Sequence, residues 1–451
     1  MSSTILTSSM YYRSKSRNRH NIRIKKSDAF ETIMMEYLLI LGMFSRWVEL
    51  SRIWRLGLLL MLVVLMTKKK FTREVGKFLI SIWFITPVAL FVLSGLLGDS
   101  REYLFFNLNR ISWPLIIATS IAVIAITKPN VIYDVLDKNF YFLNLFWIVN
   151  IIVLAIQCSG IPLFIRSSWL ELNSFYKDQC CGLFGNSGTH ELSAFSIFMI
   201  MYDLYQGYYR SKGLKKYVLI GFAFLTALIT LVLSTQNDNM AFLFILPTFI
   251  LLFYLQKAQW SGKKIGKKIL RMMKYIIPII ILTIIILQIP AISAFVDEKV
   301  IGRIERMIHY SLTGVLGSNV RVAALVYSLT DGRGWTVGYG VGAWPFAEGA
   351  TQELFHGFSN FGLNSMSTFF MLGGIWLYIA SVLLFARYLY MASYRTKKTQ
   401  CYIFVCIGIV VLFTFYTVLF NSLQSMLWLM MTFVIFGFCR DSILNKKQNN
   451  R

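Results

Sequence analysis

The 451-residue chain contains 56% hydrophobic and only 15% charged residues, and its apolar residues lie in long uninterrupted runs. This composition excludes an ordinary soluble globular protein and predicts helices surrounded by lipid. A formal net charge of +24 would suit a nucleic-acid-binding protein. Because the basic residues lie in short clusters between the apolar runs, we instead expect them to orient helices in a membrane, with no nucleic-acid partner.

The basic segment at the N-terminus, residues 1–28, contains seven Lys and Arg residues. No compact apolar segment with a small-residue cleavage site follows it, so we predict a cytoplasmic segment that is retained rather than a removable signal peptide.

The apolar runs predict an all-α, polytopic membrane bundle of about twelve transmembrane helices. Nine helices are expected within residues 29–295 and three within residues 366–439, followed by a cytoplasmic tail over residues 440–451. The expected spans lie near residues 29–44, 53–66, 78–97, 111–127, 140–157, 189–206, 217–233, 239–256, 275–295, 366–386, 401–419 and 425–439.

The distribution of basic residues sets the expected orientation. In this layout 33 of the 45 Lys and Arg residues fall in segments placed inside, and 12 fall elsewhere. Cytoplasmic segments retain positive charge during insertion, so both termini are expected in the cytoplasm.

Two predicted outer segments precede the large loop and carry ionisable groups. The first contains Arg166, and the second, GLFGNSGTHEL, carries Glu191 at the start of a membrane helix. Such groups either reach a shared cavity or lie at the lipid–water interface, and the sequence leaves both readings open.

The segment over residues 296–365 is predicted to be a large, partly helical outer loop, and loops of this length are usually functional. Arg321 is the only charge in the helical stretch NVRVAALVYSL. A lone arginine among apolar residues is costly unless it meets a cavity, a carboxylate or a phosphate. Arg321 is therefore a candidate anion ligand, with a structural ion pair as the alternative.

The next stretch, GRGWTVGYGVGAW, combines five glycines with Arg333, Trp335 and Tyr339. Glycine permits close backbone approach, and flat aromatic faces stack on sugars. A glycine-rich turn anchored by interfacial aromatics explains the same residues. Further on, His356 and Asn364 offer groups for acid–base chemistry, although each alone is typical of a solvated loop.

Metal and cofactor sites are not indicated by the sequence. The six cysteines lack metal-type spacing, and no phosphate-binding loop or nucleotide-binding fingerprint is present. We therefore expect neither a metal nor a cofactor.

A family resemblance enters with the order of these motifs. The order is RVAAL from Arg321, GYGVG from Gly338, Leu363-Asn364-Ser365, and then the pair Gly373-Gly374. This pattern, with the upstream GLFGNSGTHEL, resembles the Wzy-type O-antigen and capsule polymerases and the related O-antigen ligases. The resemblance spans roughly residues 182–378. Two departures stand out: Leu363 replaces the usual histidine, and Gln236-Asn237-Asp238 replaces the usual Ser-Arg turn.

The resemblance implies a glycosyltransferase in the bacterial cytoplasmic (inner) membrane. Such an enzyme joins undecaprenyl-diphosphate-linked oligosaccharide repeat units into O-antigen, capsule or exopolysaccharide at the outer face. It works among membrane lipids, beside a chain-length regulator and a flippase of the same pathway, and needs no metal or cofactor.

The same resemblance distributes the chemical roles. It implies that Arg321 binds the leaving diphosphate, with Arg166 and Arg333 as weaker cations. His356 or Glu191 would take the acceptor proton, with Asn364 as an orienting amide.

Three alternatives remain at this point. An O-antigen ligase of the same superfamily shares the layout, whereas a lipid-linked oligosaccharide flippase would show two similar halves, charged spans and short loops. Apart from Asp203 the expected spans are nearly free of charge, and the long loop also counts against a flippase. A structural scaffold would leave the ordered Arg, Gly and Asn pattern unexplained.

Overall fold

The computed structural model describes residues 28–44, 51–165, 180–185, 188–236, 320–345, 364–393, 417–420 and 422–449, with six further positions between 288 and 302. Helices dominate these ranges, which contain no strand, so the predicted all-α class is confirmed for them. The expected span 239–256, most of 275–295 and of 401–419, and much of the large loop lie outside the described residues.

Four described helices are long and apolar enough to cross a membrane. They are α6 (Leu104–Thr127), α8 (Phe140–Cys158), α11 (Gly213–Gln236) and α17 (Ser365–Ala392). A fifth span exists if α4 (Lys69–Leu79) and α5 (Ile82–Leu97), which are bent by 58° at their junction, count as one. These four or five helices are consistent with a membrane protein.

The expectation of twelve spans is not supported by the described residues. Helices form at four more of the expected positions: α2 (Ala29–Phe44), α3 (Ser51–Met66), α10 (Thr189–Tyr205) and α19 (Leu423–Asn449). Their apolar lengths fall short of the roughly 20 residues that a hydrocarbon core requires. Within the described residues, apolar composition thus predicted helices at these positions, and four or five helices are long and apolar enough to span.

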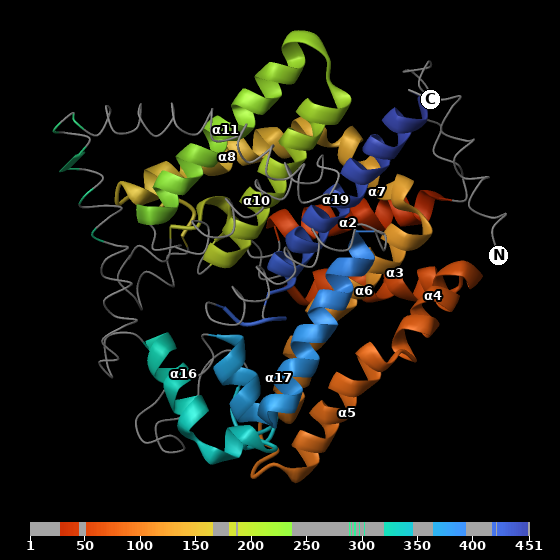
Figure 1. The fold of residues 1–451 in the computed structure, drawn as a ribbon, viewed down its shortest axis with the longest axis vertical. Helices are drawn as coiled ribbons and strands as arrows, with labels where there is room; N and C mark the ends of the chain where they lie inside the picture. Colours follow the sequence, from red (N-terminus) through yellow and green to blue (C-terminus); the bar gives the residue numbers. More distant parts are fainter. Residues whose placement is uncertain are drawn as a thin grey trace, which may run out of the picture.

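Helices α10 and α19 form the centre of the fold, and α6 packs against α19 (Figure 1). The buried Trp428 ring of α19 lies 4.7 Å from Phe195 and 5.1 Å from Phe198 of α10, measured between ring centroids. Helix α17 packs against α5 and α6, and α16 (Val320–Thr330) packs against α17. Figure 1 shows α16, α17 and the end of α5 together at one end of the molecule.

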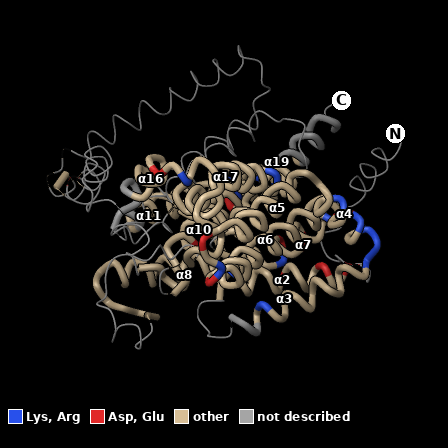
Figure 2. The backbone as a smooth tube through the Cα atoms, turned by 90° about the horizontal axis from the view of Figure 1, so that it is seen from below, with Lys and Arg blue, Asp and Glu red and all other residues tan. Residues whose placement is uncertain are grey.

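Large apolar side chains are exposed along the outer faces of several helices. Val63 of α3, Leu97 of α5, Leu145 of α8 and Leu228 of α11 are all more than half exposed. Figure 2 shows that uncharged residues form most of the backbone trace, with Lys and Arg gathered near the start of α4. Extended apolar surface of this kind suits contact with lipid.

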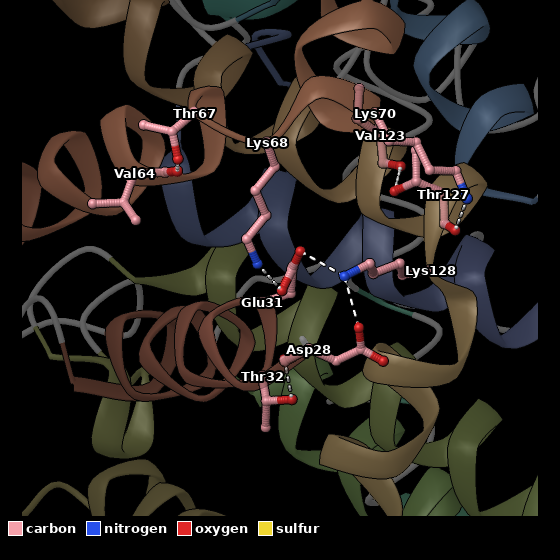
Figure 3. A network of polar contacts seen from close by, with 10 residues as sticks. All are labelled: Asp28, Glu31, Thr32, Val64, Thr67, Lys68, Lys70, Val123, Thr127 and Lys128. Carbon is pink, nitrogen blue, oxygen red and sulfur yellow. Dashed lines mark hydrogen bonds and ion pairs between the residues drawn. The ribbon is translucent and has the colours of Figure 1, made fainter. Parts of the chain in front are cut away.

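An ion-pair network connects the start of α2 with the α3–α4 junction and with the junction between α6 and α7 (Pro129–Lys138) (Figure 3). Lys68 Nζ lies 2.6 Å from one carboxylate oxygen of Glu31, and Lys128 Nζ lies 2.8 Å from the other. Lys128 Nζ also lies 2.7 Å from Asp28. Burial acts to lower the pKa of Lys128, but its hydrogen bonds to Asp28 and Glu31 outweigh burial and raise that pKa.

Glu31→Gln is expected to lower the free energy of unfolding by about 2 kcal/mol, because Glu31 is buried and both its oxygens accept charged hydrogen bonds. Thermal unfolding in detergent measures the change. Glu36→Gln is the control, since Glu36 is partly exposed, its partner Lys138 is exposed, and the pair is expected to contribute about 0.5 kcal/mol or less. Equal losses in the two variants would contradict this role for the network.

Candidate functional site

Helix α17 is interrupted by the glycine pair that the sequence pattern singled out. Gly373 has φ −143° and ψ 17°, and Gly374 has φ 75° and ψ 176°, so neither is helical. A positive φ of this kind favours glycine. Figure 1 shows α17 as two arms rather than one straight helix. The first arm, residues 365–372, is about 12 Å long, and the second, residues 375–392, is about 27 Å long.

The glycine-rich segment fills this interruption with backbone hydrogen bonds. The amide of Tyr339 donates to the carbonyl of Met371 at 2.7 Å, and that of Gly340 donates to the carbonyl of Leu372 at 2.9 Å. Ser94 Oγ of α5 donates to the same Leu372 carbonyl at 2.7 Å. Carbonyls freed by the break therefore gain partners from two other segments, as buried backbone groups require.

Turn residues between α5 and α6 hold the other side of the glycine-rich segment. The amide of Asp99 donates to the carbonyl of Tyr339 at 2.9 Å, and that of Tyr103 donates to the carbonyl of Gly342 at 3.0 Å. The buried Asn107 Nδ2 donates to the carbonyl of Trp344 at 2.8 Å. Any Cβ at Gly98 or Gly340 would overlap the other residue. The close backbone approach expected from these glycines is thus observed.

Gly374→Ala is expected to destabilise the fold by at least about 2 kcal/mol, because its Cβ would overlap the Thr336 carbonyl at a strained φ. Chemical or thermal unfolding in detergent measures the loss. Gly76→Ala in α4 is the control, since a Cβ there meets nothing within 4 Å and alanine favours helix. A variant at Gly374 as stable as the parent would show that the break is not required.

The predicted substrate-binding residues Arg333, Trp335 and Tyr339 lie together on this segment. Arg333 forms a two-pronged ion pair with Asp99, with Nη2 3.1 Å from Oδ1, and its guanidinium also covers the Tyr339 ring at 4.6 Å. The Arg333 and Asp99 side chains are 49% and 46% exposed. The hydrogen bonds to Asp99 raise the pKa of Arg333. A substrate anion could therefore bind Arg333 only if it shared the guanidinium with the Asp99 carboxylate or displaced that carboxylate.

The two aromatic residues differ in what they offer a sugar. The Tyr339 hydroxyl donates to Asp331 Oδ2 at 2.7 Å, and burial together with this hydrogen bond raises its pKa. One face of Tyr339 is already covered by Arg333. Trp335 is 50% exposed, and its indole nitrogen donates to the Leu329 carbonyl at 3.0 Å. Trp335 is thus the better placed of the two for stacking.

A buried polar cluster lies where α10, α17 and α19 begin. Its members are Glu191, Asn364, Ser365, Ser367, Thr417 and Ser422, all buried or partly buried. Asn364 caps α17, because its Oδ1 accepts from the Ser367 amide at 2.8 Å and the Ser367 hydroxyl at 2.7 Å. The helix expected near residues 366–386 therefore begins at Ser365, directly after its cap Asn364.

Glu191 is joined to the α17 start through the segment that leads into α19. Ser422 Oγ donates to Glu191 Oε1. Five residues earlier, the Thr417 carbonyl accepts from both the amide and the hydroxyl of Ser365, each at 3.0 Å. Glu191 is only 1% exposed and lies in the first turn of α10, where the helix dipole favours its negative charge.

The structure thus divides the predicted site residues into two groups at opposite ends of the first α17 arm. Glu191 and Asn364 belong to the buried polar cluster, whereas Arg333, Trp335 and Tyr339 lie at the glycine break. Arg321 is in the first turn of α16, which packs on α17, but its side chain is not among those described. Arg166 and His356 lie outside the described residues.

Several residues that organise this region were not predicted. Asp99 follows Gly98 at the end of an apolar run, and Ser422 stands in the short polar stretch before the last apolar run. Polar residues at the mouths of apolar helices were the available signal. Their partners, 234 positions away for Asp99 and 231 for Ser422, were not readable from the sequence.

Within the described ranges, no three His, Cys, Asp or Glu side chains are grouped so that they would hold a metal ion. Comparison with known proteins assigns no family: no protein-family model matches the chain, and neither a curated protein nor a solved structure matches it significantly. The functional argument therefore depends on the residues themselves.

Proposed function

We propose that the chain is a membrane glycosyltransferase that polymerises undecaprenyl-diphosphate-linked oligosaccharide repeat units into O-antigen, capsule or exopolysaccharide. The reaction would take place at the outer face of a bacterial cytoplasmic membrane. The proposal includes about twelve membrane-spanning helices and cytoplasmic termini, as the distribution of Lys and Arg favours.

One observation supports this proposal above the others. The motifs that carry the family resemblance all contact or belong to one helix, α17. The α16 helix with Arg321 packs on it, the GYGVG segment pairs with its Gly373–Gly374 break, and Asn364 caps its start. A buried carboxylate, Glu191, is connected to that cap through Ser422 and Thr417. Burying an ionisable group is costly, which favours a chemical role for Glu191 beside this helix start.

The proposed reaction transfers a saccharide from a lipid diphosphate to a sugar hydroxyl. The acceptor oxygen attacks the anomeric carbon of the donor, the bond from that carbon to the diphosphate oxygen breaks, and a glycosidic bond forms. The acceptor proton passes to a base, for which Glu191 is the described candidate, and the lipid diphosphate leaves as an anion. Arg321 would stabilise the charge on that leaving group, with Trp335 beside the sugars.

Deleting the gene and resolving the surface polysaccharide on a gel tests the proposal. A single repeat unit in place of the long ladder supports a polymerase. Complete loss of surface glycan would instead indicate a flippase, and long chains that remain unattached would indicate a ligase. A normal ladder would contradict all three.

A further inference from the structure

A second buried carboxylic acid lies between α8 and α10, far along α10 from Glu191. Asp203, in the last turn of α10, is fully buried. Asn144, in the first turns of α8, donates its Nδ2 to Asp203 Oδ1 at 3.2 Å. Asp203 is also the acidic residue that stood out within the expected spans, and the proposed reaction does not use it.

Around Asp203 and Asn144 the described residues offer fewer hydrogen-bond donors than there are acceptors. Both amide hydrogens of Asn144 are used, because Nδ2 also donates to the Phe140 carbonyl at 3.1 Å. Two acceptor atoms remain buried without a partner among the described residues: Asn144 Oδ1 and Asp203 Oδ2. Flipping the amide would turn Asn144 Oδ1 toward the Phe140 carbonyl and the carboxylate, placing acceptors together, so the orientation shown is the favourable one.

An ionised Asp203 would therefore be a buried charge that accepts one neutral hydrogen bond, which is costly in a protein interior and more so in a membrane. A single added proton removes both defects. We propose that Asp203 is a proton-binding site: Oδ2 carries a proton at neutral pH and donates it to Asn144 Oδ1, closing a ring of two hydrogen bonds between the carboxyl group and the carboxamide.

No other titratable group in the described part of this region supplies a hydrogen-bond partner for Asp203. Tyr202 and Tyr205 lie on α10, Asp137 and Tyr133 on α7, and Lys216 at the start of α11. Tyr202 accepts from Gln206 at 3.0 Å, and Arg210 of the π-helix η4 (Gln206–Arg210) lies over the Tyr133 ring at 4.8 Å. Of the described side chains, only Asn144 has a hydrogen bond to Asp203.

The proposal fixes the sign of a pH dependence. At neutral pH the native state holds a proton that the unfolded chain has released, so the unfolded state binds fewer protons and stability falls as pH rises. The folding equilibrium constant should fall up to about tenfold per pH unit until Asp203 loses its proton in the native state. Deprotonation would leave two carboxylate oxygens facing one amide and loosen the α8–α10 contact.

Infrared spectroscopy of the purified full-length protein in lipid nanodiscs tests this directly. The wild-type protein should show the carbonyl stretch of a protonated carboxylic acid at neutral pH, shifted in D₂O and lost on alkaline titration. Asp203→Asn should lack that band, whereas Asp137→Asn, which changes an exposed carboxyl, should retain it. A wild-type protein without the band would overturn the proposal. A band of the same intensity in Asp203→Asn and in the wild-type protein would also overturn it.

Unfolding measurements give a second readout. Asparagine at position 203 can form the same ring through two amide hydrogen bonds without needing a proton. Asp203→Asn is therefore expected to be at least as stable as the parent at neutral pH and to lose the downward slope toward alkaline pH. An Asp203→Asn variant that keeps the parental slope would contradict the assignment.

Discussion

Arg321→Lys is expected to abolish long polymer while leaving the protein inserted at normal levels. A planar guanidinium presents parallel donors that fit two phosphate oxygens at once, whereas lysine offers a mobile point charge. If Arg321 stabilises the leaving diphosphate, replacement should reduce the polymerisation rate by roughly a hundredfold or more. Gel analysis of polysaccharide from a complemented deletion strain, with the protein quantified in membranes, measures the effect.

The control for Arg321 is Arg101→Lys. Arg101 is an exposed arginine in the turn between α5 and α6, and it has no role in the proposed reaction. It should leave the ladder unchanged, which shows that the loss is specific to the position rather than to arginine chemistry on this face. A normal ladder in Arg321→Lys would remove Arg321 from the diphosphate site and leave a structural ion pair as its explanation.

The break in α17 shows where sequence reasoning reached its limit. The apolar run 366–386 predicted one continuous helix, because glycine inside a helix costs only about 1 kcal/mol and does not by itself signal an end. The break becomes stable only when Tyr339 and Gly340 supply amides to the carbonyls of Met371 and Leu372. The glycines in GYGVG and GG were both noticed, but their pairing with each other was not.

The start of the same helix was predictable for the opposite reason. Asn364 satisfies the exposed amides of its own helix three residues later, so the signal is local and lies within one stretch of sequence. Likewise, Glu191 at the start of an apolar helix was visible as an unusual carboxylate. Its burial against Ser422 depends on two helices that are distant in sequence, so its environment could not be predicted.

Glu191→Gln is expected to reduce polymerisation by roughly a hundredfold to ten-thousandfold if Glu191 takes the acceptor proton. Glutamine has the same shape and can still accept the Ser422 hydroxyl hydrogen bond through its side-chain oxygen. It cannot take up a proton. The rate is measured with purified protein in liposomes supplied with lipid-linked repeat units, and normalised to folded protein.

The competing explanation for Glu191 is structural, because a carboxylate in the first turn of α10 also stabilises the helix through its dipole, by about 0.3–1 kcal/mol at exposed sites and up to about 2 when partly buried. The two roles separate in Glu191→Gln. A structural role lowers the melting temperature but leaves turnover per folded molecule intact. A catalytic role lowers turnover even where the melting temperature is unchanged, and it removes the acidic limb of the pH–rate profile, because that limb reports protonation of the base. Retained turnover with that limb unchanged would eliminate Glu191 as the base and direct the search to His356.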